Sequence, residues 1–214
     1  MQKKLTFRFK NKFTSQCINY QQNKMKVKYA AHTFSASVAS AIEFLTKEYI
    51  PEFQNSEATI KFLRVIDRLF DFMNSRNPFA KGFKKPITNI DLDYLRKNTK
   101  DHIEYLFKLK TQDGTLLTRG KRRTFICGLA VTTKSILDVA SDLFSQNSTF
   151  KYLLTYKFSQ DYLEILFSKI RSRHGHNNNP NILQFKYAMR QILLHNTIKN
   201  YSNTNCMETD DDPT

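Results

Sequence analysis

Apolar residues recur along most of this chain at intervals of three and four positions, which is the period of an amphipathic α-helix. Serine or proline stands near several expected helix starts, where a serine oxygen accepts a backbone N–H and proline suits the first turn. Only five Gly and five Pro occur in 214 residues, which favours long helices over a turn-rich sandwich. The pattern predicts a mainly α-helical fold, with helices over residues 27–45, 56–73, 91–109, 124–144, 159–173 and 180–195.

The two ends of the chain depart from this helical period. Apolar and polar residues alternate around Leu5, Phe7 and Phe9, which predicts a short strand. The last residues, 201–214, are polar and acidic, and we expect them to be disordered. No internal repeat interrupts the helical pattern between the two ends.

Composition and charge restrict the class of partner. Hydrophobic residues make up 40% of the chain, which is enough to form a core, and the formal net charge is +15. A strongly basic surface is typical of proteins that bind a polyanion, nucleic acid first. The three cysteines lie far apart, so they form neither a disulfide framework nor a zinc-finger motif. No apolar run approaches the ~20 residues of a membrane-spanning helix, and we expect no membrane partner.

Two acidic residues stand in an otherwise apolar helix toward the end of the chain. Asp161 and Glu164 are three positions apart, so both project from nearly one helix face. Such acids either face solvent near the positive end of the helix dipole or form part of a site. Spacing alone favours the solvent-facing interpretation, and the interpretation as part of a site stays an alternative.

A nucleotide site of the ordinary kind is excluded, because the chain contains neither GxxxxGK[ST] nor GxGxxG. Asp71 and Asn74, at the exit of a predicted helix, suggest another kind of site. A carboxylate accepts hydrogen bonds from both N1–H and N2–H of guanine, and an amide can bond to the ring acceptors. Helix capping is the competing interpretation, and spacing alone favours it. His174 and His176 have no third ligand nearby, so we expect no zinc site.

Five stretches of the chain resemble, in order, the P element family of DNA transposases, which includes the vertebrate THAP-domain relatives. One such stretch would be weak support, but five in the same order, between Leu5 and Cys206, are specific. They are KMKVKYAAHTFSASVASAIEFL (24–45), SEATIKFLRVIDRLFDFMNSRNP (56–78), KGFKKPI (81–87), YLLTYKFSQDYLEILFSKIRSR (152–173) and NNNPNILQFKYAMRQILLH (177–195).

The resemblance implies an architecture and an activity. In this family a mostly helical insertion that binds GTP interrupts an RNase H-like catalytic domain. We therefore expect a GTP-binding insertion domain over residues 1–150, the C-terminal helical segment of an RNase H-like fold over 151–200, and a disordered acidic tail over 201–214. GTP and Mg²⁺ are the implied cofactors, DNA transposon ends the implied partner and the nucleus the implied location. The resemblance is also compatible with a homo-oligomer.

The resemblance also implies roles for individual residues. Glu164 matches the last acid of the family's catalytic Asp-Asp-Glu set, whose carboxylates hold Mg²⁺. Asp161 matches an acid that recognises the guanine base. The other implied nucleotide contacts are Lys12, Lys26, Val27, Asp71 and Asn74.

The implied catalytic set is incomplete here. In the family, the two catalytic Asp residues and a zinc-binding DNA-recognition domain lie upstream of the insertion, and no acidic residue precedes Glu43 in this chain. One Glu cannot hold two metal ions. We therefore expect the chain to contribute to DNA cleavage and strand transfer but to be inactive alone. The alternative is a non-catalytic, host-adopted helical module that binds nucleic acid or protein.

Overall fold

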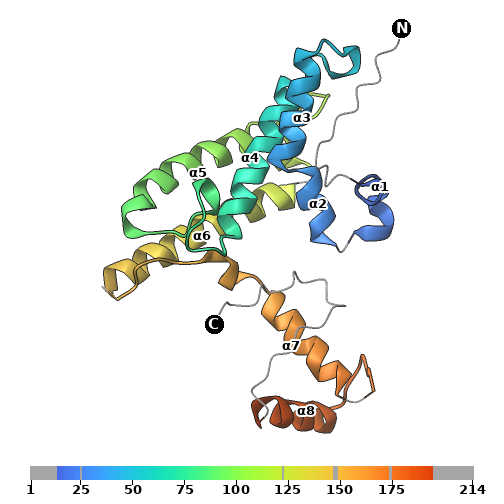
Figure 1. Cartoon of the computed structure of the whole chain (residues 1–214), viewed down its shortest axis with the longest axis vertical. Coiled ribbons are helices and arrows are strands. Elements are labelled where there is room, and N and C mark those ends of the chain that lie inside the picture. Colours follow the sequence, from blue (N-terminus) through green and yellow to red (C-terminus); the bar gives the residue numbers. More distant parts are fainter. Residues whose placement is uncertain (1–13, 25, 122, 147–148, 174, 195–214) are drawn as a thin grey trace. The chain divides into compact units, whose positions relative to one another are not determined.

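The computed structural model describes residues 14–24, 26–121, 123–146, 149–173 and 175–194. Helices dominate these residues, which confirms the predicted mainly α-helical fold (Figure 1). The chain divides into two compact units, Met1–Lys157 and Phe158–Thr214. The domain limits expected from the sequence stay predictions. The expected strand near Leu5 and the expected disordered tail lie outside the described residues.

The first unit is a bundle in which α3 packs along α4 and α5 packs along α6, with α4 also in contact with α5 and α6 (Figure 1). Short 3₁₀ turns connect several of these helices. The described helices of this unit are α1 (Ser15–Ile18), α2 (Val27–Thr33), α3 (Ala36–Lys47), α4 (Glu57–Met73), α5 (Leu92–Phe107) and α6 (Arg123–Gln146).

The amphipathic helix predicted after Ser56 is confirmed as α4. Its apolar stripe is buried at Ile60, Leu63, Val65, Leu69 and Phe72. Serine was expected to cap helix starts through its side chain, but Ser56 does not do so at α4. The Ser56 hydroxyl bonds to the Thr46 hydroxyl of α3 at 2.9 Å instead of a backbone N–H of α4, so it joins two helices.

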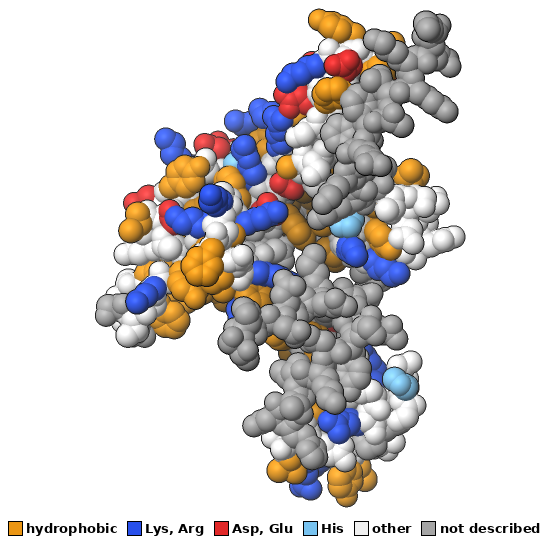
Figure 2. All heavy atoms as spheres, in the orientation of Figure 1, with side chains coloured by type: hydrophobic (Ala, Val, Ile, Leu, Met, Phe, Trp, Pro, Cys, Tyr) orange, Lys and Arg blue, Asp and Glu red, His pale blue; other side chains and the backbone are white. Residues whose placement is uncertain are grey.

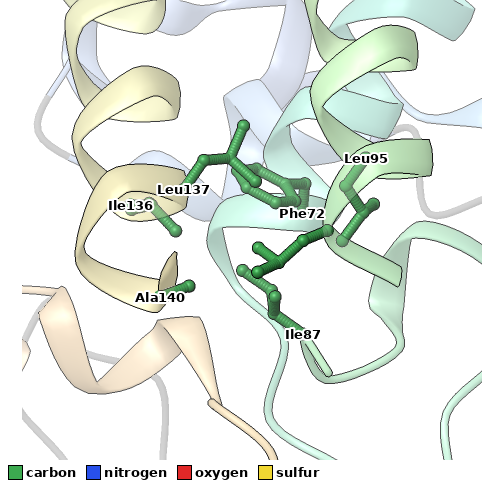
Figure 3. Packing of buried hydrophobic residues seen from close by; sticks show 7 residues of the cluster. Phe72, Ile87, Leu95, Ile136, Leu137 and Ala140 are labelled. Atoms are coloured by element: carbon green, nitrogen blue, oxygen red, sulfur yellow. The ribbon is translucent and has the colours of Figure 1, made fainter. Parts of the chain in front are cut away.

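The main hydrophobic core lies where α4, α5 and α6 meet. Phe72 at the end of α4 is 2% exposed and packs with Leu95 of α5 and Leu137 of α6 (Figure 3). Ile87, from the segment after α4, closes the same cluster and is 1% exposed. This cluster fixes the C-terminal end of α4, where Asp71 and Asn74 stand.

One continuous helix was expected from Val27 to Leu45, and this prediction is wrong. The chain forms α2 and α3 with a break at Phe34 and Ser35. Ser35 makes the break, because its hydroxyl donates to His32 O at 2.8 Å and accepts from the Val38 N–H at 3.4 Å. The apolar stripe continues through the break, so periodicity alone could not reveal it.

The exit of α4 is tied to a segment far along the chain. Thr155 is fully buried, donates to Phe72 O at 2.6 Å and accepts from the Ser75 N–H at 3.0 Å. Nearby, Ile87 and Leu153 exchange two backbone hydrogen bonds of 2.9 and 2.8 Å in an antiparallel bridge. These bonds hold the end of α4 and residues 75–87 in a defined position.

No apolar run near the length of a membrane-spanning helix was expected, but α6, among the described helices, is long and apolar enough to cross a membrane by length and composition alone. Such a criterion is weak evidence, because the core helix of a globular protein can also meet it. Here α6 contributes Ile126, Ile136, Leu137 and Ala140 to the core with α4 and α5.

The second unit contains α7 (Asp161–Ser172) and α8 (Ile182–Leu194), which contact each other. Helix α8 begins after Pro180, at Ile182, because Asn181 and Gln184 form a capping box. The Gln184 N–H donates to Asn181 Oδ1 at 2.9 Å, and the Asn181 N–H donates to Gln184 Oε1 at 3.0 Å.

Candidate functional site

The last two turns of α4 and its C-cap place three polar residues and one aromatic residue on one face. Asp67, Phe70, Asp71 and Asn74 follow the i, i+3, i+4, i+7 spacing of a helix side. Asn74 caps the helix, since its side-chain Nδ2 donates to Phe70 O at 2.9 Å. No hydrogen bond to Asn74 Oδ1 is found among the described residues, so this oxygen and one amide hydrogen remain for a ligand. Capping and ligand binding are therefore compatible at this residue.

Asp71 has an unusual electrostatic environment. Its side chain is 22% exposed, and the Lys84 Nζ lies 3.6 Å from its Oδ1. Burial, followed by the nearby Asp67 carboxylate, raises the pKa of Asp71 to about 6, against the opposing effect of Lys84. The structure thus holds a carboxylate that water and protein solvate poorly, which is typical of a functional site.

Lys84 reaches Asp71 because the intervening loop is fixed. The Ser75 hydroxyl donates to Lys84 O at 2.7 Å, directly after α4. Gly82 begins the short 3₁₀ turn that carries Lys84 and has φ +64°, a conformation that residues with a Cβ rarely adopt.

Asp67 has a structural role, because its carboxylate binds the start of another helix. Its Oδ1 accepts a hydrogen bond of 2.9 Å from the Ala36 N–H at the start of α3. A carboxylate at this position satisfies a helix N-terminus and favours its positive dipole end. Asp67 is therefore held in place, and it acts on Asp71 through its charge.

A cavity of about 850 Å³ opens between α2, α4 and α6, on the side of α4 that carries Asp67 and Phe70. Val27 from α2 lines it together with Phe70, and its walls are mostly apolar. The break at Ser35 gives α2 its own direction and so brings Val27 to this cavity. The cavity is large enough for a flat aromatic ligand. Asp71 follows Phe70 directly in α4 but is not one of the residues that line the cavity.

Lys26 stands beside this cavity. It is exposed, its Nζ lies 5.9 Å from the centre of the Tyr29 ring, and it lines a smaller neighbouring cavity that shares Val27, Ala30 and Phe34. An ammonium group at this edge suits the phosphates of a nucleotide whose base occupies the larger cavity. Lys12, the remaining expected contact, lies outside the described residues.

Asp161 and Glu164 occupy the first turn of α7, as expected from their spacing. Asp161 is half-buried and Glu164 is exposed. Both belong to the second unit, whereas Asp71 belongs to the first. Within the described residues, no group of three His, Cys, Asp or Glu side chains is arranged to hold a metal ion.

Sequence reasoning missed three residues of this region: Asp67, Phe70 and Lys84. The spacing of Asp67 and Phe70 from Asp71 was a usable signal, because all three fall on one face of α4. Lys84 belongs to a loop whose sequence does not indicate where it folds, so its pairing with Asp71 required the structure.

Two family models match the chain. The model described as TNP-like, GTP-binding insertion domain matches residues 1–86, and the model described as TNP-like, RNase H C-terminal domain matches residues 156–190. The first match contains Lys26, Val27, Asp71 and Asn74, and the second contains both acids of α7.

Known transposases show similar sequences and a similar structure. The chain is 33% identical over 171 residues to the DNA transposase THAP9 of Homo sapiens, a match that spans 79% of this chain and 19% of the relative. It is 29% identical over 182 residues to the transposable element P transposase of Drosophila melanogaster, spanning 80% of this chain and 22% of the relative. The chain therefore spans about a fifth of the length of these relatives.

A solved structure agrees with these matches. The chain superposes on the Drosophila P element transposase strand transfer complex with a TM-score of 0.65 and 28% identity, covering 89% of this chain and 41% of the other. Both units of the chain thus have counterparts in a DNA transposase.

Proposed function

We propose that this chain, which is homologous to P element-type DNA transposases and carries their GTP-binding insertion and RNase H C-terminal domains, binds GTP at the exit of α4. The observation that carries the proposal is the half-buried carboxylate of Asp71, with its raised pKa, beside Asn74 and next to an apolar cavity. Guanine presents two adjacent donors, N1–H and N2–H, which match the two oxygens of one carboxylate.

The proposed binding mode follows from the surroundings of Asp71. The guanine base lies between Val27 and Phe70, and its donor edge faces Asp71. Asn74 bonds to the base through the groups that its capping bond leaves available. Lys26, at the edge of the cavity, contacts the phosphates. Two hydrogen bonds from the base replace the lost hydration of the Asp71 carboxylate, so binding relieves an existing cost.

Two residues of the second unit have proposed roles of their own. We propose Asp161 as a residue that recognises a guanine base and Glu164 as a ligand of catalytic Mg²⁺, both from the first turn of α7. Among the described residues, no group of three His, Cys, Asp or Glu side chains is arranged to hold a metal ion. In a transposase these residues would act on DNA in the nucleus.

Calorimetric titration of the full chain with GTP and Mg²⁺ tests the GTP proposal. GTP should bind, and inosine triphosphate, which lacks the 2-amino group, should bind about tenfold or more weakly, because one charge-assisted hydrogen bond is lost. Asp71→Ala should abolish the heat of binding. Asp93→Ala, which removes an exposed acid from the first turn of α5, is the matched control and should leave the GTP affinity unchanged.

Three results would contradict the proposal. These are a folded wild-type chain that shows no heat with GTP, equal affinities for GTP and inosine triphosphate, and unchanged GTP binding in Asp71→Ala. A chain that binds nucleic acid but no GTP would instead support the alternative of a non-catalytic binding module.

A further inference from the structure

A separate cavity lies between α5 and α6, on residues that the proposed GTP site does not use. Its volume is about 460 Å³, which is within the range of small-ligand pockets. Ile103 and Phe107 of α5 and Ala130 and Leu137 of α6 form most of its walls. The walls are therefore largely apolar and include one aromatic ring, which suits a flat, weakly polar group.

One buried polar atom, on a residue that lines this cavity, lacks a partner. Thr133 is 3% exposed and lines the cavity, and its Oγ1 has no hydrogen-bond partner in the part of the chain that the structure describes. Thr99 lines the same cavity and is equally buried, but its hydroxyl donates to Leu95 O at 2.6 Å. Buried hydroxyls are normally paired, so Thr133 offers one donor and one acceptor to an occupant.

The edge of the cavity carries positive charge. Arg96, Lys100 and Lys134 line it together with one acid, Glu104. Arg96 already donates to Asp138 at 3.2 Å, and the Lys100 Nζ lies 3.9 Å from Glu104. Lys134 has no carboxylate within ion-pair distance among the described residues. Two of the three cations, Lys100 and Lys134, are thus weakly held or unpaired and can approach an external anion.

We propose that this cavity holds one unstacked base of a DNA strand. The base packs between Phe107 and the aliphatic walls, Thr133 bonds to its polar edge, and Lys100 and Lys134 contact its phosphates. Apolar walls, a single unpaired hydroxyl and a positive edge correspond to the flat faces, polar edge and phosphate of a nucleotide. The exposed surface shown in Figure 2 also mixes Lys and Arg side chains with apolar ones, as expected for a protein that contacts a charged strand.

A single-stranded oligonucleotide with one 2-aminopurine tests this proposal on the full chain. The fluorescence of 2-aminopurine is quenched by stacking on neighbouring bases, so it should rise when wild-type protein takes up the base. Thr133→Val keeps the shape and removes the hydroxyl, and it should weaken binding about tenfold, the effect of one buried hydrogen bond. Lys134→Met should lower the salt dependence of binding by about one released counterion.

Two controls separate this site from general charge effects and from the GTP site. Lys47→Met removes an equal charge from an exposed lysine of α3, and it should not change the fluorescence rise. GTP affinity should be unchanged in Thr133→Val, and oligonucleotide binding should be unchanged in Asp71→Ala. Thermal melting checks that Thr133→Val is folded, and we expect it to melt no lower than wild type, because it removes an unpaired buried hydroxyl.

Several results would overturn the proposal. One is the absence of a fluorescence rise with wild-type protein. A second is equal oligonucleotide affinity of wild type, Thr133→Val and Lys134→Met. A third is a loss of oligonucleotide affinity in Lys47→Met that equals the loss in Lys134→Met. A free deoxynucleoside monophosphate that binds as tightly as the oligonucleotide would show that the cavity takes a free nucleotide and would overturn its assignment to a strand.

Discussion

Replacing Asp71 with Asn is expected to stabilise the fold at neutral pH, although the change removes a proposed ligand-binding side chain. Burial and the Asp67 charge raise the pKa of Asp71 to about 6, from an ordinary value of 3.8. The native state then holds the Asp71 proton more tightly than the unfolded state does. The free energy of unfolding must therefore fall as the pH rises from about 4 to about 6, and stay at its lower value above that.

The magnitude follows from the two pKa values. Their difference corresponds to ~3 kcal/mol as an upper limit. The Asp71 side chain retains 22% of its exposure, which reduces the effect, and the variant also loses the pair with Lys84, worth about 0–1 kcal/mol. We expect Asp71→Asn to be more stable than wild type by about 1–2 kcal/mol at neutral pH, which is a Tm rise of about 2–8 °C for a chain of this size.

Urea unfolding followed by far-UV circular dichroism measures this effect, since the chain has no tryptophan. The quantity of interest is the difference in unfolding free energy between Asp71→Asn and wild type, followed from about pH 4 to about pH 7.5. This difference should grow with pH and level off above about pH 6.5. A difference that is constant with pH, or that shrinks as the pH rises, would refute the assigned environment of Asp71.

Asp91→Asn provides a control of opposite sign. The hydrogen bond from Lys85, followed by that from Thr88, lowers the pKa of Asp91. Because the pKa of Asp91 is lowered, its ionised carboxylate stabilises the native state at pH values above the ordinary pKa of an aspartate. This stabilisation is lost as the pH falls below that pKa. Asp91→Asn should therefore be less stable than wild type by a constant amount from about pH 4 to about pH 7.5, and this deficit should shrink only below about pH 4. Asp71→Asn instead changes relative to wild type within that range.

Two further substitutions test the contacts that shape the candidate site. Ser35→Ala removes the hydroxyl that accepts from the Val38 N–H and should destabilise the fold by ~1 kcal/mol in thermal or urea unfolding; Ser37→Ala, at an exposed position of α3, should have a smaller effect. Thr155→Val leaves Phe72 O and the Ser75 N–H unpaired in the core and should cost about 1–3 kcal/mol by the same assay. An unchanged unfolding free energy in either variant would contradict the corresponding hydrogen bonds.

The helices with a strong apolar period were predictable from the sequence. The positions of α4 and α6 follow directly from apolar spacing, because one stripe of each is buried in the core. The break between α2 and α3 was not predictable from that spacing, since the apolar stripe passes through Phe34 without interruption. A serine at the break was the available signal, and the continuous stripe outweighed it.

The candidate site was predictable only in part, because spacing along the chain relates residues of one helix but not residues that are far apart in the sequence. Asp71 and Asn74 belong to one helix exit, and local spacing could relate them. The position of Lys84 depends on Ser75 and on Thr155, a residue 80 positions further along the chain, and no local pattern encodes such a contact. Resemblance to a family suggested candidate residues, which stay predictions, but the raised pKa of Asp71 and the cavity lined by Asp67 and Phe70 required the folded chain.

A comparison of GTP with xanthosine triphosphate tests the central claim most directly. Xanthine carries an oxygen acceptor where guanine carries the 2-amino donor, so a carboxylate fits guanine and an amide fits xanthine. The wild-type chain should bind GTP more tightly than xanthosine triphosphate in calorimetric titrations, and Asp71→Asn should reverse that order. If Asp71→Asn keeps the wild-type preference for GTP, Asp71 does not recognise the base and the proposed site is wrong.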